Sequence, residues 1–489
     1  MLFSSWGYLL FLALVLAVHR ALPGARPRLW FLGLSGLAFY AMWRWEFLAL
    51  LLFSTVLDYA CGLGLARRPD DPRARRLWVL ASLIGNLGML VAFKYSGFLW
   101  DNLRGLAGLF GADWPSFQEA GIEVVLPLGI SFYTFQTMSY TLDVARGVAP
   151  ACRSFPTYLA YVGYFPQLIA GPILRPNDLV PQLEQQRLPG ADEVVAGLSR
   201  ILVGLFKKIV LADSIAPLVD QAFAADPAGL SAWEVWTGTC LFGFQIYFDF
   251  AGYSDIALGS ARAMGFTFPE NFDWPYLARS PREFWSRWHI TLSSWIRDYL
   301  YLPLAGDRFR TTSQGGIGVA AEARPDGSRH VALLLTWFIM GLWHGAAWTF
   351  AAWGVWHALL ILLYRVVPPL RALPERRPVL AWSLHLPLAM AGWIWFRAQG
   401  LPDALGRFAR LLDPRAYLEP GVTLPLGSGT IALLLLAGLL AARGVEQGLL
   451  RRPLPPALHQ SGVVLLHALM VAAVLTCLRA VQQFIYFQF

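Results

Sequence analysis

Long apolar stretches separated by short polar segments recur along the whole chain of 489 residues. A helix that crosses a bilayer takes roughly 20 mostly apolar residues. The clearest apolar stretches are residues 1–18, 77–93, 331–364, 379–396, 430–442 and 462–478. Other, less uniformly apolar stretches are 29–43, 46–62, 122–142, 157–174, 197–215 and 233–252. The pattern predicts an all-α polytopic membrane protein with about ten to twelve transmembrane or re-entrant helices, and it indicates no strands.

Composition and charge agree with a membrane protein. Charged residues make up 14% of the chain, whereas a soluble protein carries about 25%. The net charge of +8 belongs mostly to short arginine-rich loops, which gives little support to nucleic-acid binding. Such loops stay cytoplasmic, and the strongest are 66–76, 371–378 and 443–453. Since one helix follows the last of them, we expect the C-terminus on the outer side. The four cysteines show no metal-ligand spacing.

Polar residues inside the apolar stretches are functional candidates, because polar groups are costly in lipid. Residues 131–147 carry Gln136 and Asp143 among aromatic residues, and residues 242–259 carry Asp249 and Asp255 among phenylalanines. One interpretation is a polar path through an apolar body, as in a transporter, a channel or an enzyme with a tunnel. The other is hydrogen bonding between helices that holds the bundle together. The pattern alone leaves both open.

The segment 277–304 predicts an amphipathic helix in the plane of the membrane interface. Ser280 and Glu283 match the N-cap and third positions of a capping box, with Pro281 in the first turn. His289 falls at or beside the apolar stripe of this helix, which indicates that it points into the protein. A catalytic histidine and a hydrogen-bonded interfacial histidine both fit this pattern.

His344 lies in the longest charge-free run of the chain, between Trp343 and Gly345. We expect a helical hairpin there, with 331–347 entering and 347–366 returning, and small residues that allow close backbone approach. A neutral imidazole can take and return a proton near neutral pH without the cost of a buried charge. His344 is therefore the strongest candidate base, with a structural histidine as the alternative. Walker A, HExxH and GxSxG motifs are absent from the sequence.

Several motifs together resemble the membrane-bound O-acyltransferase family. "RWHITLSSWIRDYLYLPL" is followed about fifty residues later by "MGLWHGAAWTFAAWG". "SFYTFQTMSYTLDVARG", "YFPQLIAGPI", "YFDFAGYSDIALGSARAMGF" and the final "FIYFQF" are similar to the alginate O-acetyltransferase subgroup. The resemblance implies one integral membrane domain over 1–489, with a ring of helices around a central tunnel. It covers the motif-bearing core at 125–366 and the aromatic tail at 484–489. We also expect a periplasmic loop at 397–427.

The resemblance also implies chemistry and site residues. His344 corresponds to the near-invariant histidine of the family and would act as general base, and His289 corresponds to its second conserved polar position. An acyl thioester such as acetyl-CoA would be the donor substrate, with no permanently bound cofactor and no metal. The remaining polar candidates, as second-shell or structural residues, are Asp249, Asp255, Gln136, Asp143 and Trp343.

For partners and location, the resemblance implies a bacterial inner-membrane enzyme that serves an extracellular polysaccharide, with alginate favoured. A separate periplasmic acetyltransferase or carrier protein would complete the transfer. We hypothesise that Tyr486 receives the acetyl group on the outer side; the alternative is an aromatic belt that anchors the last helix. Two other functions stay open, a transporter of an acylated lipid or solute and a non-catalytic scaffold of an export complex.

Overall fold

The computed structural model describes residues 3–485, apart from residues 4, 118, 123, 169–170, 307, 312–316, 321–325, 450–455 and 479–483. Tyr486 therefore lies outside the described residues. The chain folds into two compact units. Unit 1 comprises Met1–Gly197, Ala257–Pro269 and Gly306–Ala323. Unit 2 comprises Leu198–Ile256, Glu270–Ala305 and Arg324–Phe489.

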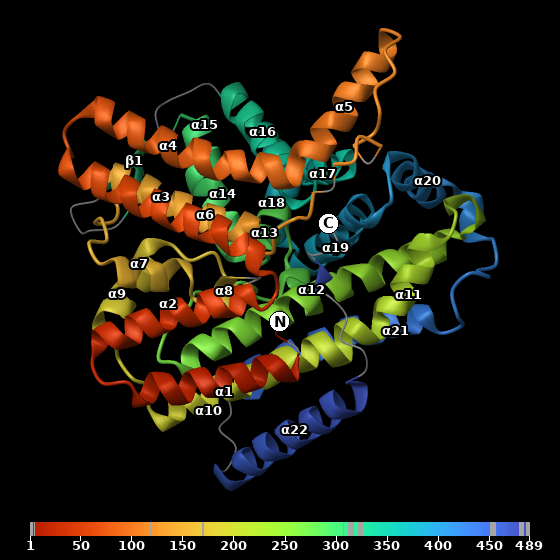
Figure 1. Ribbon diagram of the computed structural model, residues 1–489. Coiled ribbons are helices and arrows are strands. Elements are labelled where there is room, and N and C mark those ends of the chain that lie inside the picture. The colour runs from red at the N-terminus through yellow and green to blue at the C-terminus, as the bar shows by residue number, and fades with distance from the viewer. Residues whose placement is uncertain are drawn as a thin grey trace. The chain divides into compact units, whose positions relative to one another are not determined.

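Unit 1 is built mostly from helices of the first 185 residues. In chain order they are α1 (Trp6–Ala21), α2 (Ala25–Ala41), η1 (Trp45–Phe47), α3 (Leu48–Arg67), α4 (Pro72–Leu90), η2 (Val91–Tyr95), α5 (Ser96–Leu109), α6 (Ile130–Arg146), α7 (Phe155–Val162), α8 (Phe165–Leu168) and α9 (Pro176–Gln185). Helices α3, α4 and α6 pack side by side and form its centre (Figure 1). The sequence indicated no strands, but β1 (Arg308–Thr311) and β2 (Ile317–Ala320) pair as a short antiparallel hairpin.

Unit 2 contains the long helix α12 and most of the second half of the chain. Helix α10 (Ala191–Leu205) begins in unit 1 and ends in unit 2, and α12 (Ala232–Ala263) runs from unit 2 into unit 1. The other elements are η3 (Phe206–Ala212), α11 (Asp213–Ala224), η4 (Pro227–Gly229), η5 (Pro275–Leu277), α13 (Pro281–Trp285), α14 (Ile290–Ile296), η6 (Arg297–Tyr301), α15 (Leu302–Leu304), α16 (Asp326–His344), α17 (Trp348–Val366), α18 (Pro368–Arg376), α19 (Pro378–Arg397), α20 (Leu401–Leu412), η7 (Pro414–Tyr417), α21 (Ser428–Leu449) and α22 (Pro456–Cys477).

The described residues include five helices that are long and apolar enough to cross a membrane. They are Trp45–Arg67, Pro72–Leu109, Trp348–Val366, Pro378–Arg397 and Ser428–Gly448. Trp6–Ala21 and Ser461–Cys477 are shorter apolar helices. These helices confirm the predicted class, an α-helical polytopic membrane protein, while the number of crossings stays a prediction.

Helices α16 and α17 form the hairpin that the charge-free run predicts (Figure 1). Glycines on both helices allow the backbones to touch. A Cβ atom at Gly341 would lie 2.2 Å from the carbonyl oxygen of Phe350, and one at Gly354 would lie 2.0 Å from that of Trp337. Because such distances are far below van der Waals contact, only glycine fits at either position. This close packing fixes the end of α16, where His344 lies.

The prediction of one continuous helix over 277–304 is wrong. The helix begins as predicted, since the Ser280 hydroxyl accepts the Glu283 backbone N–H at 3.2 Å. It ends at Trp285, and a new helix, α14, starts at Ile290. Between them His289 adopts a positive φ of 42°, a left-handed conformation that is uncommon for residues other than glycine. The orientation of His289 therefore comes from this turn and not from helical periodicity.

Candidate functional site

His289 is completely buried in unit 2 and is held by Asn271. Its Nδ1 lies 3.0 Å from Asn271 Oδ1. The backbone on both sides of the turn is fixed as well, because the N–H of Ile290 donates to the Asn271 carbonyl at 2.9 Å. Asn271 thus binds the ring and the start of α14 together, which stabilises the left-handed turn at His289.

The contacts of Asn271 determine which nitrogen of His289 carries the proton. The Thr291 hydroxyl donates to Asn271 Oδ1 at 2.9 Å, and the Thr291 backbone N–H approaches the same atom at 3.3 Å. A backbone N–H can only donate, so this atom of Asn271 is the oxygen and the facing Nδ1 of His289 is the donor. In a neutral ring the proton then sits on Nδ1, and Nε2 carries the lone pair.

Sequence reasoning missed Asn271. It follows Pro269 and Glu270 in a segment between α12 and α13, outside the apolar stretches in which polar residues were sought. The available signal was a polar amide within "FPENFDWPY", since a buried asparagine among aromatic residues needs partners for its amide group. In the structure Asn271 is buried, and its amide nitrogen donates to the Ser254 hydroxyl of α12 at 3.2 Å.

His344 is the last residue of α16, and its side chain is 3% exposed. Aromatic rings surround it, with ring-centroid distances of 4.9 Å to Trp343, 4.9 Å to Trp353 and 5.6 Å to Phe396. The predicted small residue beside it is present, but the side of Gly345 is filled, because a Cβ there would lie 2.1 Å from the Phe350 ring. His344 is therefore enclosed by aromatic rings and is almost inaccessible to solvent.

A continuous series of ring contacts joins the two candidate histidines within unit 2. From His289 it passes through Phe272, Trp288, Trp393 and Phe396 to His344, with successive centroid distances of 6.5, 5.2, 4.9, 5.6 and 5.6 Å. Trp288 and Trp393 thus form the middle of one aromatic cluster that contacts both imidazoles.

Asp249 belongs to a buried ion-pair cluster at the middle of α12. Its Oδ1 lies 2.5 Å from Lys208 Nζ, which also lies 2.7 Å from Asp213 Oδ1. Its Oδ2 accepts the backbone N–H of Ile485 at 2.8 Å. The sequence suggests the same supporting role for Asp249 and Asp255, but in the structure Asp249 also binds the backbone of Ile485 near the end of the chain.

Asp255, six residues later on α12, has a different set of partners. Its carboxylate pairs with Arg200 at 3.0 Å and with Lys207 at 2.6 Å. Arg200 also pairs with Glu270. The cluster lies partly exposed, and it ties the end of α10 and the start of η3 to α12. These contacts are those of a structural ion-pair network.

Gln136 and Asp143 lie in unit 1, on α6, whereas both histidines, Trp343 and the two aspartates lie in unit 2. The amide nitrogen of Gln136 donates to the Tyr161 carbonyl at 2.7 Å, which connects α6 to α7. Asp143 lies in the last turn of α6, and its carbonyl accepts the N–H of Val148 at 2.9 Å. The Gln136 contact supports the interhelical role that the sequence left open for this residue.

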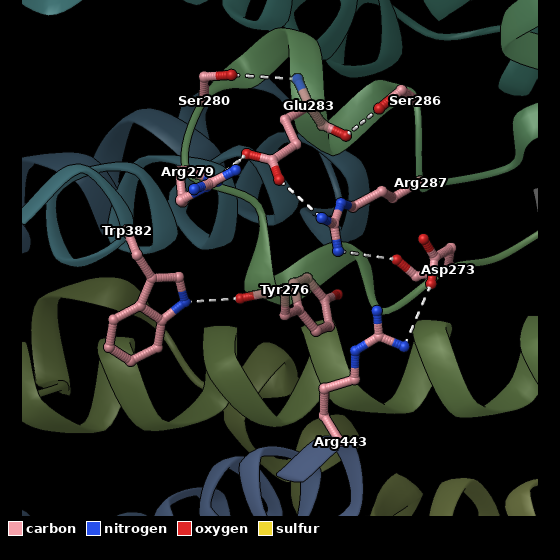
Figure 2. A network of polar contacts seen from close by, with 9 residues as sticks. All are labelled: Asp273, Tyr276, Arg279, Ser280, Glu283, Ser286, Arg287, Trp382 and Arg443. Carbon is pink, nitrogen blue, oxygen red and sulfur yellow. Dashed lines mark hydrogen bonds and ion pairs between the residues drawn. The ribbon is translucent and has the colours of Figure 1, made fainter. Parts of the chain in front are cut away.

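A polar network surrounds the start of α13, close in sequence to His289 (Figure 2). Glu283 accepts the backbone N–H of Arg279 at 2.8 Å and pairs with Arg287 at 2.7 Å. Burial raises the pKa of the Glu283 carboxyl, but these contacts outweigh it and hold the pKa below its ordinary value. Farther along, Arg443 of α21 lies 3.9 Å from Asp273, and both residues are labelled in the figure. The network braces the segment that leads into the His289 turn.

Two further histidines, His357 and His385, are buried in the same unit. The Phe284 ring contacts both, at centroid distances of 6.1 and 6.0 Å, and Trp285 contacts His357 at 5.0 Å. Among the described residues, none of their four ring nitrogens has a hydrogen-bond partner.

Comparison with known proteins gives a consistent set of matches. Residues 148–396, which carry both candidate histidines, match the model of MBOAT, the membrane-bound O-acyltransferase family. The chain is 39% identical to a probable alginate O-acetylase of Azotobacter vinelandii, over 84% of this chain and 78% of that protein. It is 38% identical to a probable alginate O-acetylase of Pseudomonas aeruginosa, over 83% of this chain and 73% of that protein. A peptidoglycan O-acetyltransferase of Helicobacter pylori is 34% identical, over 78% and 72%.

Proposed function

The chain belongs to the membrane-bound O-acyltransferase family, and we propose that it moves an acetyl group from a cytoplasmic thioester to the outer side for O-acetylation of an extracellular polysaccharide. As a member of this family it is a multi-pass membrane O-acyltransferase. The relatives named for alginate and peptidoglycan support a polysaccharide acceptor, with alginate favoured. Acetyl-CoA is the proposed donor.

The observation that carries the proposal is the burial of His289 and His344 in one aromatic cluster of unit 2. In the proposed step the hydroxyl oxygen of the acceptor attacks the thioester carbonyl carbon. His344 takes the hydroxyl proton, the carbon–sulfur bond breaks, and the proton passes to the departing thiolate. General-base catalysis of this kind contributes about 10²–10⁴-fold in rate. The aromatic surroundings of His344 exclude water, which also disfavours hydrolysis of the thioester.

The tautomer of His289 narrows its role. A neutral ring with the proton on Nδ1 presents a lone pair at Nε2, so it accepts a hydrogen bond there and does not donate one. Polarising the thioester carbonyl requires a donor. We therefore favour His289 as the group that orients the thioester, by accepting a hydrogen bond from an N–H or O–H of the donor substrate, with Asn271 holding the ring in place.

The outer half of the reaction is proposed to use a relay. The polymer lies outside the membrane. The acetyl group must therefore leave the interior of the protein on an acceptor that reaches the polymer side. Tyr486, one residue after Ile485, offers a phenolic hydroxyl that would carry the acetyl group to a periplasmic acetyltransferase or carrier protein. The proposed relay requires the protein to lie in the bacterial inner membrane with its C-terminus in the periplasm. An aromatic belt that anchors the last helix is the alternative role for Tyr486.

A transfer assay separates this function from the transporter and scaffold alternatives. The purified protein is given acetyl-CoA labelled in the acetyl group, and release of the label is measured for the wild type, His344→Gln and His344→Ala. We expect both variants to lose at least about 10²-fold in rate, because neither side chain can take the proton. A transporter or a scaffold that forms no acyl bond would release no label even as the wild type. Wild-type rates in His344→Ala would eliminate His344 as the base.

Tyr486→Phe tests the relay and keeps the aromatic surface. The expected result is loss of polymer acetylation in cells that express the variant, with the amount of protein in the membrane unchanged. Tyr417→Phe, a change of another phenol in the same unit, serves as the control. Unchanged acetylation in Tyr486→Phe would leave only the aromatic-belt role.

A further inference from the structure

The C-terminal residues Phe484 and Ile485 are anchored in the interior of unit 2. Their side chains are 0% and 4% exposed. The backbone N–H of Ile485 donates to Oδ2 of Asp249 at 2.8 Å, although the two residues are 236 positions apart in the chain. A buried carboxylate is a strong acceptor for a backbone N–H, because a hydrogen bond to a charged group is about twice as strong as a neutral one.

The Phe484 ring adds an aromatic contact on the same face of α12. Its centroid lies 4.3 Å from that of Tyr253 and 5.5 Å from that of Phe250. Phe250 in turn packs edge-on against His289 at 4.6 Å. The C-terminal residues are therefore one aromatic ring away from a candidate site histidine.

Lys208 supplies the charge that makes this anchor stable. Its ammonium lies between the carboxylates of Asp249 and Asp213, at 2.5 and 2.7 Å. Each buried charge is costly alone, and removing one member of a buried pair leaves the other uncompensated. Since Lys208 approaches Oδ1 of Asp249, Oδ2 is the atom that receives the Ile485 N–H.

We propose that Lys208 and Asp249 form a latch that holds residues 484–485 against α12, where the Phe484 ring packs on Phe250, the ring that contacts His289. Both are positioning residues, since neither is proposed to contact the thioester or the hydroxyl. The latch concerns only where residues 484–485 are held. Its effect on acetyl transfer rests on the proposed relay function.

Hydrogen–deuterium exchange of the intact protein in lipid nanodiscs measures the latch directly. The readout is the exchange rate of amides in the peptide that contains Phe484 and Ile485. In Asp249→Ala the rate is expected to rise about 10–100-fold, the factor that corresponds to a hydrogen bond to a charged group. Asp249→Asn, which keeps an acceptor oxygen, should give a smaller rise. Peptides from α16 and α17 should exchange as in the wild type.

Asp255→Ala is the matched control, because it removes a carboxylate from the same helix that is also ion-paired but has its partners in α10, η3 and Glu270. Its tail peptide should exchange like that of the wild type. Ile485→Pro provides a second test if Asp249→Ala does not fold. Proline removes the donor N–H and leaves the ion pairs intact, so the Phe484 amide should exchange faster. Unchanged tail exchange in both Asp249→Ala and Ile485→Pro would overturn the latch.

Acetyl release measured on the same samples keeps the two proposals apart. Faster tail exchange together with slower acetyl transfer supports the latch and the relay. Faster tail exchange with normal transfer supports the latch and contradicts the relay. Unaltered tail exchange contradicts the latch, whatever the transfer rate.

Discussion

Two buried regions, the Asp58 network of unit 1 and the neighbouring His357 and His385 of unit 2, treat their polar groups in opposite ways. At the centre of unit 1, Asp58 of α3 accepts hydrogen bonds from Ser82 and Asn86 of α4 and from Thr141 of α6, at 2.5, 2.6 and 2.5 Å. In unit 2, His357 and His385 lie among aromatic rings, and among the described residues their ring nitrogens have no hydrogen-bond partner. One region is a closed network of protein partners, and the other is not.

The difference separates structural polar residues from candidates for chemistry. Buried polar groups in proteins are almost always hydrogen-bonded, and those without a protein partner usually meet water or a ligand. The Asp58 network, which Ser54 extends by donating to Asn86 at 2.7 Å, satisfies its own members and joins three helices. His357 and His385 instead offer their ring nitrogens to something other than the described residues of the protein. Reaction chemistry is therefore expected in unit 2.

The largest expected effect comes from breaking the closed network. Asp58→Ala removes the common acceptor of three buried donors, and each unsatisfied group costs about 1–3 kcal/mol. We expect the free energy of unfolding to fall by about 3 kcal/mol or more, measured as a lower thermal unfolding midpoint in detergent. Asp101→Ala, a change of an exposed carboxylate on α5, is the control. An unchanged midpoint in Asp58→Ala would mean that the network does not hold unit 1 together.

A smaller effect, on rate and not on folding, is expected from Asn271→Leu. Leucine cannot accept a hydrogen bond from Nδ1 of His289, so the ring loses the contact that fixes its tautomer. The rate of acetyl release should fall about 10–100-fold, the range found when hydrogen-bond partners that orient metal-ligating histidines are removed. Asn271→Asp keeps an acceptor and should lose less. If the leucine variant folds and works at the wild-type rate, the tautomer of His289 is irrelevant to catalysis.

The smallest expected effect comes from His357→Phe. It should leave the free energy of unfolding unchanged or raise it, whereas Asp58→Ala lowers it. Replacing a buried polar ring that lacks a protein partner with an apolar ring of similar shape removes a desolvation penalty. The unfolding midpoint should stay the same or rise, by the equivalent of about 1 kcal/mol at most. A clear drop would show that His357 has a stabilising partner. His467→Phe, a change of a half-buried histidine, provides the comparison.

Much of the fold followed from local patterns in the sequence. Apolar length predicted the membrane class, and the charge-free run with its glycines predicted the α16–α17 hairpin around His344. Ser280 and Pro281 predicted the start of α13. Each of these features depends on residues close together in the chain, where helical periodicity, capping and close packing leave a readable signal.

The candidate site could be predicted only in part. His344 and His289 were found as imidazoles in apolar surroundings and by resemblance, but the helix that was expected to orient His289 is interrupted before it. The partners of these residues were not predictable. Asn271 is a single amide outside the apolar stretches, and nothing in the local sequence distinguishes the partners of Asp249 from those of Asp255.

The sequence by itself determined that this chain is a helical membrane protein with two histidines in apolar surroundings, because hydrophobic length and residue type are local properties. The tertiary structure decided which polar groups pair: Asn271 with His289, and Lys208 with Asp249 and the backbone of Ile485. Those pairings join segments up to 236 residues apart. A buried charge or amide must find a partner wherever the fold brings one within about 3 Å, and separation along the chain does not encode that distance.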